Sequence, residues 1–151
     1  MDTNRIAILD FGSQFTQLIA RRIRELGVYS EIYPHHVSRD QLRKFNPGGL
    51  VFSGGPSSIY DIDAPKRSDI KELLEDFPIL GICYGMQLLA AEFGGEVQAS
   101  ATREYGANTI TWEKSKKTQK VWMSHGDYVS QIPPGSDTLA RSENKMPAAF
   151  E

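Results

Sequence analysis

The chain has one cysteine, no long apolar run and no excess of positive charge, and each shortage excludes a class of protein. A single cysteine forms no internal disulfide, so we expect a cytoplasmic protein rather than a disulfide-rich secreted domain. No stretch approaches the ~20 apolar residues that cross a bilayer, and the run at residues 6–9 is too short for a signal peptide. The sequence therefore predicts no membrane role.

The charges nearly balance, with 17 Lys and Arg against 19 Asp and Glu and a net charge of −2. This balance gives no basic face for nucleic acid, because binding to phosphates requires clustered positive charge. At 151 residues, 40% hydrophobic and 24% charged, the composition is that of an ordinary globular protein. We therefore expect one folded domain over residues 1–151 that does not bind nucleic acid.

Short apolar runs alternate with helix-spaced segments up to Gly95. Buried parallel strands are predicted at residues 6–9, 29–33, 50–52 and 79–82. Helices are predicted at residues 15–26, 38–45, 68–75 and 86–93, with Ser38 as an N-cap. In the first helix the predicted apolar face holds Phe15, Leu18, Ile19, Ile23 and Leu26.

This alternation predicts an α/β fold, a doubly wound and mostly parallel sheet with helices on both faces. Ligands of such sheets lie beyond the carboxyl ends of the strands, here at residues 10–14, 53–58 and 83–87. After Gly95 the pattern changes to short β-like pieces, which predict a small antiparallel extension. Those pieces lie at residues 96–99, 108–112, 120–123 and 138–140, and the charged run 113–120 is expected to be a loop or hairpin tip.

The strongest local signal is Gly81-Ile82-Cys83-Tyr84-Gly85, a G-x-C-x-G at a predicted strand-to-helix junction. With serine in the centre, this pattern is a nucleophile elbow, a sharp turn that exposes the nucleophile beside an oxyanion hole. A thiol at the first turn of a helix also meets unpaired N–H groups, which lower its pKa. The alternative is a small buried cysteine at the end of a core strand.

Two further segments are ambiguous by themselves. Ser53-Gly54-Gly55-Pro56 could place N–H groups beside an oxyanion or could form a plain turn, and no Gly-Lys-Ser/Thr follows to make a P-loop. His125 lies close to Asp127, so it could act as a base or could only shape a loop. His35 and His36 have no further ligands at metal-binding spacing, so no metal site is expected.

Several blocks in order resemble the class I (triad) glutamine amidotransferases. They cover nearly the whole chain, at residues 8–14, 21–29, 53–56, 81–87, 103–106 and 121–127. The cysteine elbow and the Ser-Gly-Gly-Pro loop are shared across that class. The first and last blocks resemble the subgroup whose N-terminal glutaminase domain feeds ammonia to an ATP-pyrophosphatase domain.

The resemblance implies a chemistry and a set of residues. Cys83 would attack the side-chain amide of glutamine, release ammonia and form a γ-glutamyl thioester that water hydrolyses. The backbone N–H groups of Gly55 and Tyr84 would form the oxyanion hole. The glutamine amino and carboxylate groups would be held by the family's pocket residues, which correspond here to Gln87, Ser124, His125, Gly126 and Asp127.

The resemblance also implies a partner, because ammonia in this subgroup passes to an ATP-pyrophosphatase domain to which nothing in this chain corresponds. ATP and Mg²⁺ are expected there, and no cofactor is expected in this domain. The family's catalytic base and its orienting carboxylate come from a His-Pro-Glu segment, which the 151 residues lack. We therefore expect an incomplete glutaminase domain with little activity; the stretch 111–120 is also shorter than the family's usual loop.

Two alternatives remain open from the residues. The chain could be the glutaminase part of another amidotransferase, or a non-catalytic module that binds glutamine or docks on a synthetase. The block at residues 122–127 argues against the first, and the missing base keeps the second open.

Overall fold

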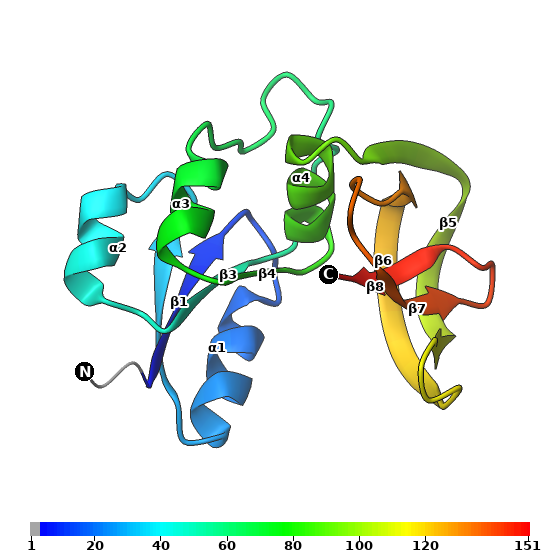
Figure 1. Cartoon of the computed structure of the whole chain (residues 1–151), viewed down its shortest axis with the longest axis horizontal. Helices are drawn as coiled ribbons and strands as arrows, with labels where there is room; N and C mark the ends of the chain where they lie inside the picture. The colour runs from blue at the N-terminus through cyan, green and yellow to red at the C-terminus, as the bar shows by residue number, and fades with distance from the viewer. Residues whose placement is uncertain (1–3) are drawn as a thin grey trace. The chain divides into compact units, whose positions relative to one another are not determined.

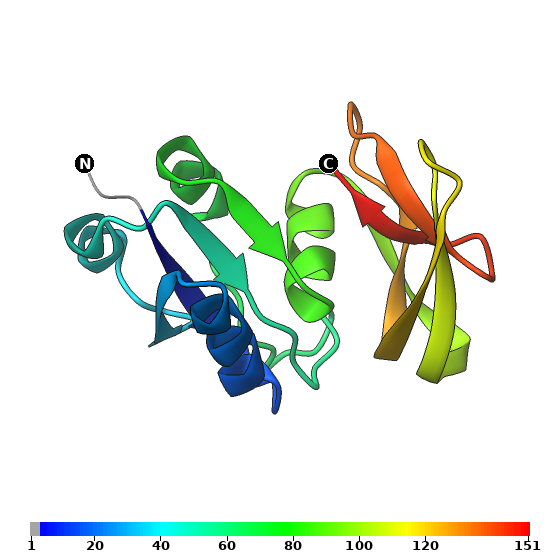
Figure 2. The same ribbon diagram turned by 90° about the horizontal axis from the view of Figure 1, so that it is seen from below.

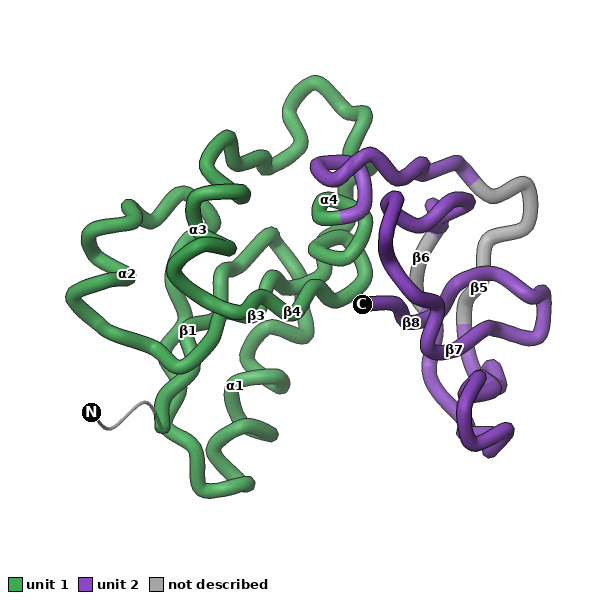
Figure 3. Tube along the Cα trace, viewed as in Figure 1, with its two compact units in different colours: residues 1–89 green, residues 90–151 purple. Residues whose placement is uncertain are grey.

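The computed structural model describes residues 4–151, apart from the side chains at 100–105 and 124–125 (Figure 1). The chain divides into two compact units, Met1–Leu89 and Ala90–Glu151 (Figure 3). Each unit contains one four-stranded sheet, parallel in the first and antiparallel in the second. The predicted α/β architecture with an antiparallel addition is confirmed.

The sheet of the first unit has the order β2-β1-β3-β4. Its strands are β1 (Arg5–Asp10), β2 (Tyr29–Pro34), β3 (Gly49–Phe52) and β4 (Ile79–Gly81). All three pairings are parallel, and the register places Leu9 beside Phe52 and Phe52 beside Gly81. The carboxyl ends of β1, β3 and β4 therefore meet at one edge, where Phe11, Ser53 and the chain leading to Cys83 follow the strands.

Helices cover both faces of this sheet, as Figure 2 shows: α1 (Thr16–Glu25) lies on one side, and α2 (Arg39–Phe45) and α3 (Ile70–Asp76) lie on the other. The fourth helix, α4 (Tyr84–Glu92), begins directly after Cys83. Because each strand is followed by a helix that packs back on the sheet, the strand ends are left free to carry loops.

The face of α1 that packs on the sheet differs from the predicted one. Ala20 is buried in one cluster with Ile8 and Val51, and Ile19 and Ile23 pack against this cluster. Phe15 is 43% exposed, Leu18 44% and Leu26 82%, so the predicted place of these three side chains on the packed face is wrong. The small Ala20 lets the helix approach the sheet closely, which turns the flanking leucines toward solvent.

Helices α2 and α3 are joined by side chains. The hydroxyl of Ser38 accepts a hydrogen bond from the Gln41 N–H, and the Gln41 side-chain oxygen accepts one from the Ser38 N–H, which confirms the predicted N-cap as a full capping box. Across the two helices, Arg39 and Arg43 both contact the carboxylate of Asp76, at 2.6 and 2.7 Å. These guanidinium groups hold the pKa of Asp76 well below its usual range.

The second unit is built on a long hairpin of β5 (Glu96–Trp112) and β6 (Thr118–Gln131). Strands β7 (Thr138–Ser142) and β8 (Pro147–Phe150) complete the order β6-β5-β7-β8. The separate pieces predicted at 96–99 and 108–112 are thus parts of one strand. Residues 113–117 of the charged run form the hairpin tip as predicted, with Lys116 in a left-handed conformation at φ +54°. Residues 118–120, also predicted in the loop, belong to β6 and pair with β5.

No helix in the described part of the chain, residues 4–151, is long and apolar enough to span a bilayer.

Candidate active site

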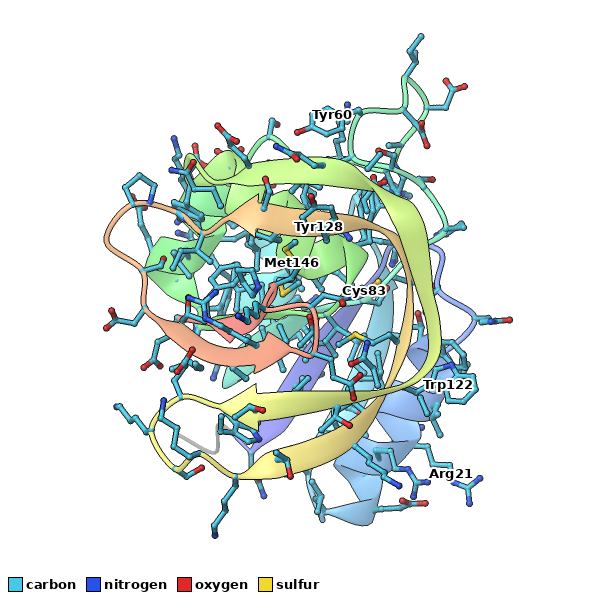
Figure 4. All side chains as sticks on the ribbon, turned by 90° about the vertical axis from the view of Figure 1, so that its right-hand side faces the viewer. Arg21, Tyr60, Cys83, Trp122, Tyr128 and Met146 are labelled. Atoms are coloured by element: carbon cyan, nitrogen blue, oxygen red, sulfur yellow. The ribbon has the colours of Figure 1, made fainter. Side chains whose placement is uncertain are left out.

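Cys83 lies at the junction of β4 and α4 (Figure 4) and has a left-handed backbone, with φ +53°. A non-glycine residue pays about 1–2 kcal/mol for this conformation because its Cβ approaches the following carbonyl oxygen. Such strain persists only where the surrounding chain fixes the turn. The sequence pattern of a nucleophile elbow is therefore matched by the backbone geometry of an elbow.

The two glycines of the G-x-C-x-G pattern are sites of close backbone approach. A Cβ on Gly85 would lie 2.4 Å from the carbonyl oxygen of Phe52, and one on Gly81 would lie 2.6 Å from the Met86 nitrogen. Both distances are far inside normal contact, so any side chain would push α4 away from the ends of β3 and β4. The glycines thus bring the first turn of α4, and Cys83 with it, directly against the sheet.

The Ser53-Gly54-Gly55-Pro56 loop, which follows β3, lies against the elbow. A Cβ on Gly54 would be 3.4 Å from the Cβ of Cys83, which is ordinary contact distance. The buried Ser53 ties the loop to both neighbours. Its hydroxyl accepts from the Phe11 N–H at 2.9 Å, and its carbonyl accepts from the Gly85 N–H at 3.1 Å.

Two backbone N–H groups are candidates for an oxyanion hole. The Gly55 N–H has no hydrogen-bond partner among the described residues, and Gly55 packs so closely that a Cβ would lie 2.4 Å from the Phe11 carbonyl oxygen. The Tyr84 N–H donates to the thiol of Cys83. In the first unit the fold thus brings Gly55, Cys83 and Tyr84 together at the carboxyl edge of the sheet.

The pKa of the Cys83 thiol is raised above its usual value, contrary to the prediction from its place at a helix start. Burial is the main cause, since it disfavours the charged thiolate, and the hydrogen bond from the Tyr84 N–H acts in the opposite direction. The sequence pattern located the N–H donor but could not show how far the surrounding residues remove water from the sulfur.

Among the other predicted site residues, Gln87 lies in the same unit, on α4, and is 4% exposed. Its N–H donates to the Cys83 carbonyl at 3.0 Å, so it lies one helical turn after the elbow. Gly126 and Asp127 lie on β6 in the second unit. The side chains of Ser124 and His125 fall outside the described residues.

His35 lies in the first unit, next to a hollow of about 420 Å³ that it shares with Asp10, Phe11 and Pro56. Its ring centroid is 5.7 Å from that of Phe11, and burial lowers its pKa. Cys83 is not among the residues that line this hollow. Within the described part of the chain, no three His, Cys, Asp or Glu side chains converge as metal ligands do.

Sequence reasoning missed the segment that follows the Ser-Gly-Gly-Pro loop. The hydroxyl of the wholly buried Tyr84 donates to the Pro65 carbonyl at 2.7 Å. The Arg67 side chain, only 4% exposed, pairs with Asp69 at 2.7 Å and donates to the Val37 carbonyl at 2.9 Å. The bonds to Pro65 and Val37 join side chains to backbone carbonyls of distant segments, and a single sequence carries no signal for them.

A family model described as Glutamine amidotransferase class-I matches residues 7–151. Among curated proteins, the glutamine-hydrolysing GMP synthase of Bdellovibrio bacteriovorus is 49% identical over 148 residues, which cover 95% of this chain and 29% of that protein. The GMP synthase of Brachyspira hyodysenteriae is 50% identical over 156 residues, 98% of this chain and 30% of that protein. The chain thus spans less than a third of the length of these relatives.

Solved structures give the same fold. A putative GMP synthase subunit from Thermoplasma acidophilum is 28% identical, with a TM-score of 0.76 over 97% of this chain and 77% of that one. A glutamine amidotransferase from Methylobacillus flagellatus, at 24% identity, has a TM-score of 0.72 over 99% of this chain and 66% of that one, a likeness of fold alone.

Proposed function

The chain belongs to the class I glutamine amidotransferases, and from that membership we propose that it takes the amide nitrogen of glutamine as ammonia through a thioester on Cys83. The observation that carries the proposal is the left-handed Cys83 turn, packed between Gly81 and Gly85 and in contact with the Gly54 backbone. This is the geometry that a nucleophile elbow requires.

In the proposed reaction the Cys83 thiolate adds to the side-chain amide carbon of glutamine. The carbonyl oxygen takes the negative charge, and the N–H groups of Gly55 and Tyr84 stabilise it, each worth about 3–4 kcal/mol in comparable sites. The carbon–nitrogen bond then breaks, and a proton goes to the leaving ammonia. Water attacks the remaining γ-glutamyl thioester, which releases glutamate and restores the thiol.

The base that takes the thiol proton is not assigned to any histidine of this chain. His125 belongs to the block that would bind glutamine, and the family's base belongs to a His-Pro-Glu segment that these 151 residues lack. A positioned base contributes ~10²–10⁴-fold to such reactions. In the proposal, the base comes from outside these residues, and its positive charge would offset the burial that raises the pKa of Cys83.

The relatives suggest where the ammonia goes. They are GMP synthases that are more than three times as long as the segment they share with this chain. We propose that this domain works with an ATP-pyrophosphatase domain or subunit, which binds ATP and Mg²⁺ and aminates XMP to GMP, in the cytoplasm. In the proposal, glutamine is the substrate of this domain, and Gln87 of the first unit is one of the residues that would contact it.

The test uses intact-mass spectrometry after incubation with a diazoketone analogue of glutamine. The proposal predicts one adduct on Cys83, slowed by added glutamine and lost in Cys83→Ala. The Tyr33→Phe variant controls for effects of mutation and purification that do not involve the elbow, because Tyr33 lies on β2 and its hydroxyl donates to Glu31. No adduct on a folded sample would contradict the proposed chemistry.

One observation favours the second candidate, a module that binds glutamine without reacting. The raised pKa of Cys83 leaves less thiolate at neutral pH than a free cysteine has. Calorimetry separates the two candidates: glutamine binding without any adduct would support the module, and adduct formation that glutamine suppresses would support the amidotransferase.

A further inference from the structure

Tyr84 is the largest of the described side chains that are wholly buried, with 0% exposure. The proposed chemistry uses only its backbone N–H. A buried phenol needs a hydrogen-bond partner, and here the partner is the Pro65 carbonyl at 2.7 Å. The residue that follows the nucleophile is thus fixed at both ends, by its backbone in the elbow and by its hydroxyl in a distant loop.

The loop that carries the Pro65 carbonyl is held two residues further on. There the Arg67 guanidinium is almost fully buried and pairs with Asp69 at 2.7 Å. The same group donates to the Val37 carbonyl at 2.9 Å and to the His35 carbonyl. The bonds of Arg67 restrain the loop beside Pro65, so the loop can anchor Tyr84.

The Tyr84 ring also touches the other side of the proposed oxyanion hole. A Cβ on Gly55 would lie 3.6 Å from the ring's Cγ, and the ring centroid is 5.7 Å from that of Phe11. Phe11 in turn carries the carbonyl that Gly55 approaches most closely. One side chain therefore contacts the segments that present both proposed N–H donors.

We propose that the Tyr84 side chain is a positioning residue, whose hydroxyl bond to Pro65 holds the strained Cys83–Tyr84 turn so that the Tyr84 N–H faces the developing oxyanion. This rests on the proposed glutamine chemistry. The left-handed Cys83 needs neighbours that fix it. The Gly85 N–H closes the turn on the Ile82 carbonyl, and the Gln87 N–H bonds to the Cys83 carbonyl. The Tyr84 hydroxyl adds a bond from the turn to a distant loop, which these local bonds do not provide.

The test compares two electrophiles on the full 151-residue chain. With a chloroketone analogue of glutamine, the Cys83 thiolate first adds to the ketone carbon, which puts negative charge on the ketone oxygen. The C=O bond then re-forms as this carbon–sulfur bond breaks, and Sγ bonds to the neighbouring methylene carbon as chloride leaves. Iodoacetamide loses iodide by direct displacement and needs no oxyanion hole. In Tyr84→Phe, which keeps the ring and removes the hydroxyl, we expect the chloroketone rate constant to fall ~10-fold while the iodoacetamide rate constant stays within ~2-fold.

Tyr33→Phe is the matched control, because it removes a tyrosine bond of the same length, 2.7 Å to Glu31, on another strand. Neither rate should change in that variant. As a second measurement, the exchange rate of the Gly85 N–H, which donates to Ser53, should rise in Tyr84→Phe and not in Tyr33→Phe.

The outcomes separate the two proposals. If the unchanged chain shows no reaction that glutamine suppresses, the proposed function fails and this inference fails with it. If the unchanged chain reacts and Tyr84→Phe reacts equally fast, or if both electrophiles slow down together, only the positioning role of Tyr84 is overturned.

Discussion

Cys83 combines a strained backbone with a poorly ionised thiol, and the two properties have different causes. Its left-handed conformation follows from the close approach of α4 to β3, which the glycines at 81 and 85 permit. Its raised pKa follows from burial, which outweighs the hydrogen bond from the Tyr84 N–H. The elbow therefore places Cys83 beside the Gly54 backbone without, by itself, ionising the thiol.

The pH dependence of Cys83 alkylation tests whether burial outweighs the hydrogen bond from the Tyr84 N–H. Only the thiolate reacts, so a raised pKa means a smaller reactive fraction at pH 7 and a midpoint shifted to higher pH. We expect the iodoacetamide rate of Cys83 to reach half its plateau above pH ~8.5, the pKa of an unperturbed cysteine. A midpoint below that of a model thiol in the same buffer would show that the helix start outweighs burial.

Gly85→Ala tests the close approach of α4 to the sheet. Its Cβ would fall 2.4 Å from the Phe52 carbonyl oxygen and 2.7 Å from the Phe52 Cβ, so the helix must move. We expect a loss of about 3 kcal/mol in the free energy of unfolding, measured by urea titration, and loss of labelling at Cys83.

Gly27→Ala is the matched control for that variant. Gly27 has φ +78° but nothing within 4 Å of its Cβ position. The variant should therefore lose only the ~1 kcal/mol in free energy of unfolding that a strained backbone costs, and its Cys83 should still be labelled. Equal losses in the two variants would mean that the clash at Gly85, whose φ is not positive, costs no more than a strained backbone does.

At this scale the sequence predicts the nucleophile and the turn, because Gly81, Cys83 and Gly85 are contiguous and their pattern is local. It does not predict the pKa of Cys83 or the bond from Tyr84 to Pro65. Both depend on segments that are distant along the chain, and burial of a sulfur atom depends on all of them together.

Among the elements, the helices were predicted best where their ends carry side-chain signals. Ser38 and Gln41 form the capping box of α2, and the helix begins where they indicate. Asp69 makes no side-chain cap, and α3 begins at Ile70, two residues after its predicted start. In α1 the apolar residues cover a wide arc of the helix, so more than one face could pack on the sheet. The face that does pack is the one that carries Ala20.

The capping box of α2 should contribute measurably to stability. Ser38→Ala removes the hydroxyl that accepts from the Gln41 N–H, and such losses cost about 1 kcal/mol. Thermal unfolding of the variant should show the loss, with Ser68→Ala as the control, since the Ser68 side chain makes no hydrogen bond among the described residues. A Ser38→Ala protein as stable as the control variant would contradict the capping role.

The long hairpin was the element predicted least well. Strand β5 runs from Glu96 to Trp112, although only its two ends show the expected pattern of strand residues. Its pairing with β6, as between Asn108 and Val121, joins residues far apart in the sequence. Cross-strand pairing can thus extend a strand through residues whose own preferences do not specify it.

At the scale of the whole molecule, the order of elements in the first unit followed from the alternation of strands and helices. The division into two units between residues 89 and 90 could not be predicted in this way. The boundary lies inside α4, and the sequence there has none of the residues typical of a linker. The family match at residues 7–151 spans both units. Both units thus belong to the matched family region, and the described elbow lies in the first unit.

The absence of a His-Pro-Glu segment predicts slow turnover for these 151 residues. We expect glutamate release, normalised to the fraction of chains that the diazoketone labels, to be ~10²–10⁴-fold slower than for the full-length GMP synthase of Bdellovibrio bacteriovorus. Cys83→Ala provides the background rate. A normalised rate equal to that of the full-length relative would show that this chain holds a working base.

The most direct test of the Cys83 chemistry is acylation by the γ-methyl thioester of L-glutamate. Its leaving group is a thiolate that needs no proton, and at a pH high enough to ionise the Cys83 thiol the step needs no base either, so it depends on the elbow and the oxyanion hole. The new Sγ–carbon bond forms as methanethiolate leaves, and the product is the same γ-glutamyl thioester that glutamine would give. Peptide mass mapping should find the γ-glutamyl group on Cys83, formed faster from the L-thioester than from its D-enantiomer; equal rates for the two enantiomers, or no acylation of a folded sample, would contradict a glutamine site built around Cys83.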